Sequence, residues 1–129
     1  MRMGGRPGAG PRPANLLAER LRARGEDMLR AARALAAALR SRGARDLILF
    51  GSLARGPDAV GPTSDVDLAV VMPGVGAERM HRRLTDLPEV LDFPYPLDLF
   101  VFTPEEWQQA SQTWFVAHEI ISGGLVLGG

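Results

Sequence analysis

Apolar residues recur at three- and four-residue steps between Ala14 and Arg42, with arginines on the intervening positions. This spacing predicts an amphipathic helix. Asn15 is a candidate N-cap, and Gly43 is expected to end the helix. Gly25 interrupts the pattern, so a kinked helix and two shorter helices remain alternatives. The apolar stripe consists of Leu17, Leu21, Met28, Ala32, Leu35 and Leu39.

Short apolar runs bounded by turn residues predict strands at 47–50, 66–72 and 97–102. A short helix is expected around 52–55, a loop at 56–64 and another helix at 77–87. Thr103, Pro104 and Glu106 predict a helix start, because they combine an N-cap, a first-turn proline and a capping box. The stripe of this last helix is expected to run to Ile121, followed by a short strand at 125–127.

This order of elements predicts an α/β (α+β) fold in which helices flank a small mixed sheet, with a long N-terminal helix. The chain has 129 residues, 46% of them apolar and 23% charged, which fits one globular domain. Residues 1–13 are rich in glycine, proline and arginine and predict a disordered tail. We therefore expect a single domain over 14–129.

The net charge of zero hides an uneven distribution. Residues 1–45 carry eleven arginines and three acids, whereas residues 46–129 carry four arginines and twelve acids. A solvated arginine face on the first helix explains the basic half more simply than direct nucleic-acid binding.

The chain has no lysine, which excludes a Walker-type phosphate loop. It also has no cysteine and no apolar run of the roughly 18 residues that a membrane helix needs. We expect a cytoplasmic protein without a membrane partner.

Three aspartates carry the candidate chemistry. Asp65 and Asp67 lie two positions apart at a predicted strand, so their side chains share one face. Asp98 interrupts another apolar strand, where a partner across the sheet would explain it. Adjacent carboxylates repel each other, and a divalent cation relieves this cost. The three acids together predict a site for two Mg²⁺ ions and a nucleoside triphosphate, with Asp98 as proton acceptor.

Gly51 and Ser52 lie where the first strand turns into a short helix. Backbone N–H groups at such a turn can hold phosphate oxygens, and glycine permits close approach. Arg55 lies near enough in sequence to neutralise phosphate charge. Each feature alone has an ordinary explanation: a turn, a solvated cap or a satisfied core acid. Their order and local context together favour the metal–nucleotide interpretation.

Other residues with chemical potential fit ordinary roles better. His81 and His118 lack ligand spacing to each other or to the acids. Trp107 and Trp114 fit helix packing, and Tyr95 is expected to shape a loop near Asp98, with contact to a nucleobase as the alternative.

These motifs resemble the minimal nucleotidyltransferases of the DNA polymerase beta superfamily, over about residues 47–127. The similarity rests on LFGSLARG at 49–56, SDVDL at 64–68, and Asp98 followed by TPEEW at 103–107. It implies that Asp65 and Asp67 bind both metals, that Asp98 binds the catalytic one, and that Gly51 and Ser52 contact the triphosphate. The loop between Ser52 and Asp65 is longer than in close relatives of the family.

The resemblance further implies a partner and an acceptor. Related proteins are antitoxins that neutralise a HEPN-domain ribonuclease toxin by transferring AMP from ATP to it. The N-terminal helix is a candidate surface for a homo- or hetero-oligomer. Two alternatives stay open: transfer to a small molecule, as in aminoglycoside nucleotidyltransferases, and neutralisation by contact without catalysis.

Overall fold

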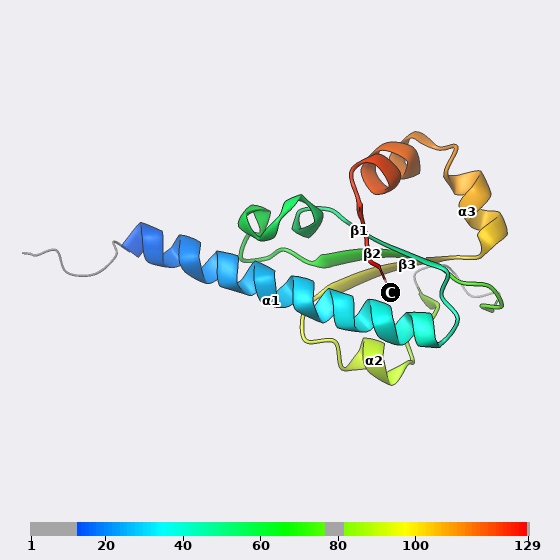
Figure 1. Ribbon diagram of the computed structural model, residues 1–129, viewed down its shortest axis with the longest axis horizontal. Helices are drawn as coiled ribbons and strands as arrows, with labels where there is room; N and C mark the ends of the chain where they lie inside the picture. Colours follow the sequence, from blue (N-terminus) through cyan, green and yellow to red (C-terminus); the bar gives the residue numbers. More distant parts are fainter. Residues whose placement is uncertain (1–12, 77–81, 129) are drawn as a thin grey trace, which may run out of the picture.

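The computed structural model describes residues 13–76 and 82–128 as three layers built on one four-stranded sheet (Figure 1). The elements in chain order are α1 (Pro13–Ser41), β1 (Asp46–Phe50), the 3₁₀ turns η1 (Leu53–Arg55) and η2 (Pro57–Ala59), β2 (Val66–Val71), α2 (Pro88–Leu91), β3 (Leu97–Phe102), α3 (Pro104–Ala110), the π-helical η4 (Val116–Ser122) and β4 (Leu125–Val126).

The sheet has the strand order β3-β2-β1-β4 and is mixed, as predicted. β1 runs antiparallel to both β2 and β4, whereas β2 and β3 are parallel. A parallel pair needs a crossover connection, and the segment between β2 and β3 supplies it, with α2 at its far end. β3 and β4 are therefore the edge strands.

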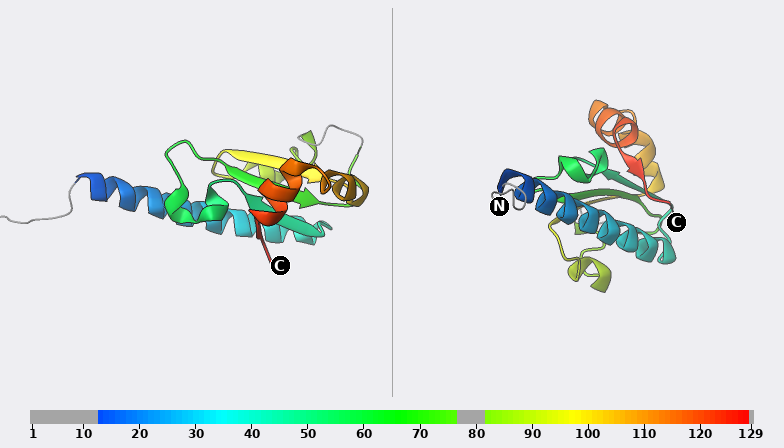
Figure 2. Two further views of the ribbon diagram at one scale, coloured as in Figure 1. Left: turned by 90° about the horizontal axis from the view of Figure 1, so that it is seen from above. Right: turned by 60° about the vertical axis from the view of Figure 1, so that its left-hand side comes forward.

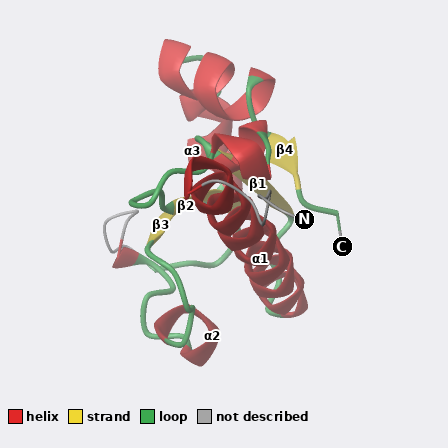
Figure 3. Ribbon diagram, turned by 90° about the vertical axis from the view of Figure 1, so that its left-hand side faces the viewer, coloured by secondary structure: helices red, strands yellow, loops and turns green. Residues whose placement is uncertain are grey.

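Alternation along the strands divides the apolar residues between two cores on opposite faces of the sheet. Figure 3 shows α1 and α2 on one face, and α3 with the C-terminal helical segment on the other. The larger core joins α1 to one face, with Met28 and Leu39 fully buried against residues such as Leu49 and Leu68. The smaller core consists of Ile48, Phe50, Ala69, Phe102, Val116 and Ile120.

α1 is a single continuous helix, so neither alternative raised by Gly25 is right. Gly25 is buried, and a Cβ atom built there would lie 2.6 Å from the carbonyl oxygen of Pro57. The glycine thus permits close packing of η2 on the helix. The Asn15 cap is also wrong, because Asn15 lies inside the helix. Gly43, with φ of 110°, follows its end as predicted.

The first turns of α1 project beyond the sheet (Figure 2). Leu17, placed on the apolar stripe, is 56% exposed, and the buried part of the stripe starts only near Gly25. Residues 1–12 lie outside the described residues. The predicted tail over 1–13 and the single domain over 14–129 therefore stay predictions.

Some of the short elements between β1 and β3 differ from the prediction. Of the helix expected at 77–87, residues 77–81 lie outside the described part, and 82–87 form turns in which Leu84 has φ of 67°. A leucine in this left-handed region cannot continue a helix. The 56–64 loop contains η2, which was not predicted, and α2 was not predicted either.

The capping box after β3 is confirmed: Thr103 and Glu106 cap each other across the first turn of α3. The helix then ends at Ala110 instead of running to Ile121. Thr113 lies in the segment between α3 and η4. Its hydroxyl donates a hydrogen bond to the Ala110 carbonyl and accepts one from the backbone N–H of Val116. The second half of the predicted stripe is consequently wrong, since Trp114 and Ile121 are 66% and 47% exposed.

Candidate functional site

The three aspartates meet at one end of the sheet, on the face that carries α3 and η4. Asp67 lies in β2 and pairs in register with Asp98 of β3, so the two side chains leave the sheet side by side. Asp65 precedes β2 by one residue and shares the face of Asp67 by the alternation of the strand. One ligand atom from each of the three residues lies within 4.8 Å of the others.

The environment of these carboxylates is crowded with negative charge. Asp65 and Asp67 are half-buried, and Asp98 is exposed. Burial, and then repulsion by Asp98 and Asp65, raises the pKa of Asp67 from 3.8 to about 6. Partial desolvation and the Asp65 carboxylate raise the pKa of Asp98 as well. A group of carboxylates that resists full ionisation is stabilised by a cation.

Gly51 makes room for this cluster. Its φ is 81°, and a Cβ atom built on it would lie 2.2 Å from Oδ2 of Asp67. A side chain at position 51 would therefore be strained and would also collide with a candidate metal ligand. The sequence predicted a glycine that permits close approach to phosphates, and the structure shows close approach to Asp67.

Ser52 is tied to the segment that leads into β2. Its hydroxyl donates to Oγ of Ser64 over 3.2 Å, and Ser64 in turn accepts the N–H of Gly61 over 2.9 Å. The longer loop is thus closed onto the Gly51–Ser52 turn directly before Asp65. Sequence reasoning missed this role of Ser64, although its position beside Asp65 was a signal. The side chain of Arg55 is exposed, and its guanidinium has no hydrogen-bond or ion-pair partner within the described residues.

Helix α1 supports the same loop through a residue that no motif marks. The guanidinium of Arg24 approaches the carbonyl oxygens of Gly61 and Ser64 at 3.4 and 3.5 Å. It also lies 5.3 Å from the ring centre of Tyr95, whose hydroxyl donates to Asp27 of α1. Tyr95 therefore shapes the loop before β3, as expected.

The remaining candidates lie away from the acids or are exposed. Trp107 packs on Phe102 with ring centres 5.1 Å apart, as predicted, whereas Trp114 is exposed and stacks on His118. His81 lies outside the described residues. One group was missed: the rings of Phe50, Phe100 and Phe115 gather on the face that carries the aspartates, and Phe115 is 46% exposed.

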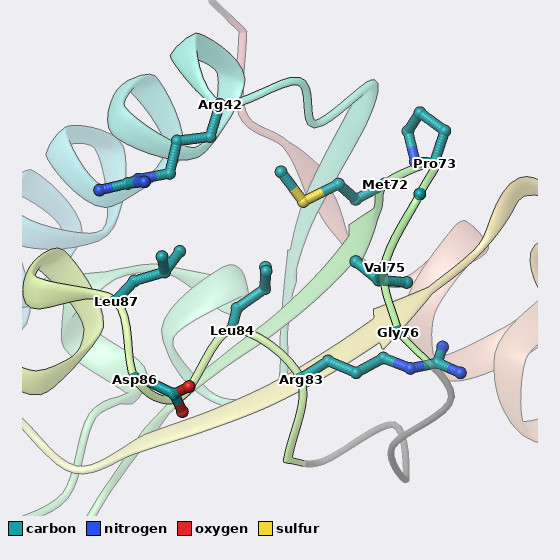
Figure 4. A pocket seen from close by; sticks show the side chains of 10 residues that line it. Arg42, Met72, Pro73, Val75, Gly76, Arg83, Leu84, Asp86 and Leu87 are labelled. Carbon is teal, nitrogen blue, oxygen red and sulfur yellow. The ribbon is translucent and has the colours of Figure 1, made fainter.

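A hollow of about 330 Å³ lies at the opposite end of β2, past Met72 (Figure 4). Leu84, Leu87 and Val75 give it an apolar lining, and the guanidinium groups of Arg42 and Arg83 turn away from each other. Both arginines already pair with carboxylates, Arg42 with Glu89 and Arg83 with Glu106. Asp86 adds a carboxylate to the lining, but the hollow lies at the end of β2 away from the three aspartates.

The donor set at the aspartates fits a hard divalent cation. Mg²⁺ prefers carboxylate oxygens and completes its shell with water and phosphate. Asp65, Asp67 and Asp98 supply three such oxygens around one point, and their mutual repulsion supplies the driving force.

The profile of the nucleotidyltransferase domain family matches residues 32–121. This range includes all three aspartates and most of the sheet. The chain belongs to the nucleotidyltransferase domain family. Neither a curated protein nor a solved structure matches it.

Membership confirms the polymerase beta-like superfamily and a transferase activity in general. The nucleotidyltransferase match begins at position 32, so the projecting turns of α1 lie outside it. None of the helices in the described part of the chain combines the length and hydropathy that crossing a membrane requires.

Proposed function

We propose that this nucleotidyltransferase transfers AMP from ATP, with Mg²⁺, to a hydroxyl group of a partner protein. The observation that carries the proposal is the convergence of three carboxylates from two neighbouring strands in a chain of this family. Asp65, Asp67 and Asp98 would hold the metal ions. When bound, Mg²⁺ would neutralise the triphosphate and polarise its α-phosphate.

The reaction is an in-line displacement at the α-phosphorus. The acceptor oxygen forms a new bond to phosphorus, while the bond from phosphorus to the α–β bridging oxygen breaks and pyrophosphate leaves. The hydroxyl proton passes to the carboxylate of Asp98 and from there to solvent. Asp98 suits this role because it is the most exposed of the three acids and its pKa is raised.

Arg55 and Ser52 would bind the triphosphate. Arg55 has a free guanidinium among the described residues, and a bidentate contact to phosphate oxygens suits it. Ser52 would exchange its hydrogen bond to Ser64 for one to a phosphate oxygen. Gly51 has no side chain, so the space beside the Asp67 carboxylate stays clear.

The partner we propose is a HEPN-domain ribonuclease toxin, with this chain as its antitoxin in the cytoplasm. The resemblance to antitoxins of that class supports it. The exposure of Asp98 also leaves the acceptor side of the site open to a macromolecule. Transfer to a small hydroxyl compound is the competing outcome, because a hollow of about 390 Å³ lies beside Asp98.

Label transfer from α-labelled ATP tests the proposal, in lysate of the native host and with purified candidate partners. We expect a labelled protein band with wild type and loss of about 10²–10⁴-fold in rate for Asp98→Asn. Asp46→Asn is the matched control, since it removes a carboxylate at the opposite end of the same sheet. Label in small molecules alone would favour the aminoglycoside-type reaction. A toxin still neutralised by a folded Asp65→Asn/Asp67→Asn protein would indicate a non-catalytic antitoxin.

A further inference from the structure

The outer edge of β3 offers backbone groups beside Asp98. Among the strands of the described residues, β3 pairs with β2 alone, and its register is fixed over all six residues. The N–H groups of Val66 and Met72 bond to the carbonyls of Pro96 and Phe102, so even-numbered residues of this segment direct their backbone groups toward β2. Since the direction alternates along a strand, Leu97, Leu99 and Val101 direct theirs outward.

One of these three outward positions is already covered. The carbonyl of Val101 accepts a hydrogen bond of 3.1 Å from Arg83, which Glu106 holds in place. Within the described part of the chain, no hydrogen bond covers the outward groups of Leu97 and Leu99. The uncovered stretch of the edge is thus centred on Asp98.

A hollow of about 390 Å³ follows the same stretch. Leu97 and Leu99 line it from the face that packs on α1, and Asp98 and Phe100 line it from the opposite face. Because both faces of the strand contribute, the hollow lies along the edge and not on one side of the sheet. Thr85 and Tyr95 add polar groups to its wall.

We propose that the acceptor is a protein segment in extended conformation that adds to the outer edge of β3 and presents a serine, threonine or tyrosine hydroxyl beside Asp98. The inference rests on the proposed transfer of AMP. Leu97 and Leu99 direct their backbone groups outward and lie two residues apart. This matches an extended chain, in which every second residue directs its backbone groups to the same side. A residue placed opposite Asp98 has its side chain on the face of Asp98, with Cβ atoms about 5 Å apart. A helical acceptor would satisfy its own backbone and leave Leu97 and Leu99 unpaired.

The step itself is the displacement described above, with the acceptor now specified. The side-chain oxygen of the docked segment bonds to the α-phosphorus as pyrophosphate leaves, and its proton moves to Asp98. Backbone pairing would hold the hydroxyl in place during the reaction, which accounts for part of the rate through orientation.

Backbone-methylated peptides test this docking. The probes are nine-residue peptides rich in valine and glutamine, with one central serine, threonine or tyrosine. Each is made unmodified, N-methylated on the central amide, or N-methylated on the two amides beside it. In an edge-paired peptide only one of these alternate sets faces β3. We expect methylation of that set to lower kcat/KM by about tenfold or more, and methylation of the other to change it less than about twofold.

Two protein-side measurements complete the test. Peptide binding should slow hydrogen exchange at the amides of Leu97 and Leu99 by about tenfold or more. Leu97→Pro should label the best peptide more slowly than Leu97→Ala, because both lose the side chain and only proline removes the outward N–H. Equal effects of both methylation sets, or binding without exchange protection, would overturn the docking mode.

Binding of Mg²⁺–ATP, measured by calorimetry, separates the two hypotheses. If Mg²⁺–ATP binds and a small hydroxyl compound is labelled while no peptide is, the extended acceptor is wrong and nucleotidyl transfer stands. If Mg²⁺–ATP neither binds nor labels any acceptor, the proposed function itself fails, and this inference fails with it.

Discussion

At the scale of single residues, Gly51 links backbone conformation to the candidate metal site. Gly51→Ala should lower the free energy of unfolding by about 1–2 kcal/mol through its positive φ. It should also weaken Mg²⁺ or Mn²⁺ binding, because the new Cβ occupies the place of the Asp67 carboxylate. Urea unfolding and metal titration measure the two effects.

Gly74→Ala is the matched control for that substitution. Gly74 has a similar φ of 75°, but a Cβ there meets nothing within 4 Å. The Gly74→Ala variant should therefore be less stable than the wild type but bind metal with unchanged affinity. If both variants bind metal equally well, the close approach of Gly51 and Asp67 is irrelevant to the site.

Asp67 predicts a pH dependence of the metal-free protein. Its pKa is about 6 when folded, against 3.8 as the ordinary value, so the folded state binds the extra proton between these pH values. Stability is therefore greatest below this window and falls as the pH rises through about 6. Asp67→Asn removes the repelling charge and should melt a few degrees higher than wild type at pH 7.5 in chelator.

The same comparison in Mg²⁺ supplies the control. Metal should raise the melting temperature of the wild type and leave that of Asp67→Asn nearly unchanged. A wild type that melts higher at pH 7.5 than at pH 5 in chelator, with Asp67→Asn unaffected, would contradict the assigned repulsion.

At the scale of elements, the contact between α1 and η2 reverses an ordinary propensity. In a solvent-exposed helix, Gly→Ala stabilises by about 1 kcal/mol. Gly25→Ala should instead destabilise, because its Cβ would lie 2.6 and 2.8 Å from backbone atoms of Pro57. Ala23→Gly, at an exposed position of the same helix, measures the propensity alone. A stabilised Gly25→Ala protein would disprove the tight packing.

The start of α3 predicts a second pH effect, of opposite sign. The ion pair with Arg83 and the backbone N–H of Thr103 lower the pKa of Glu106 from 4.5 to about 2. Its contribution is present above pH 4.5 and is lost as the pH falls toward 2. Glu106→Gln should reduce the loss of stability between pH 4.5 and 2. Melting temperatures measured at several pH values test this. Glu105→Gln removes an exposed charge from the same turn and should leave that loss in place.

Elements with strong local signals were predicted well, and elements decided by tertiary contacts were not. The alternation around Asp67 and Asp98 gave both strands and their shared face, and the capping box gave the start of α3. Nothing local shows that Gly25 packs on Pro57, that Leu84 takes a left-handed conformation, or that a helix breaks after Ala110. The bond between Ser52 and Ser64 and the support from Arg24 also depend on segments brought together only by the fold.

At the scale of the whole molecule, the projecting end of α1 is separable from the domain. Residues 15–20 are all exposed. Removing residues 1–20 should change the free energy of unfolding by less than about 0.5 kcal/mol. Removing residues 1–27 should cost much more, since it deletes Arg24, Gly25 and the Asp27 partner of Tyr95. Urea unfolding compares the two.

Sedimentation of the shorter deletion also tests the predicted oligomer. If the N-terminal helix joins copies or partners, the protein lacking residues 1–20 should sediment as a smaller species than the full chain. An unchanged sedimentation coefficient, corrected for mass, would rule out this surface as the contact.

The parallel pairing of β2 with β3 affects the order in which the nascent chain assembles the three aspartates. Asp65 and Asp67 are synthesised before the crossover and β3. α1, β1 and β2 can assemble first through contacts close in sequence, whereas the parallel partner arrives late and must close a long loop. The third carboxylate is therefore the last of the three to be installed, and a nascent chain cannot hold the proposed metal ions until β3 has been synthesised and has paired with β2.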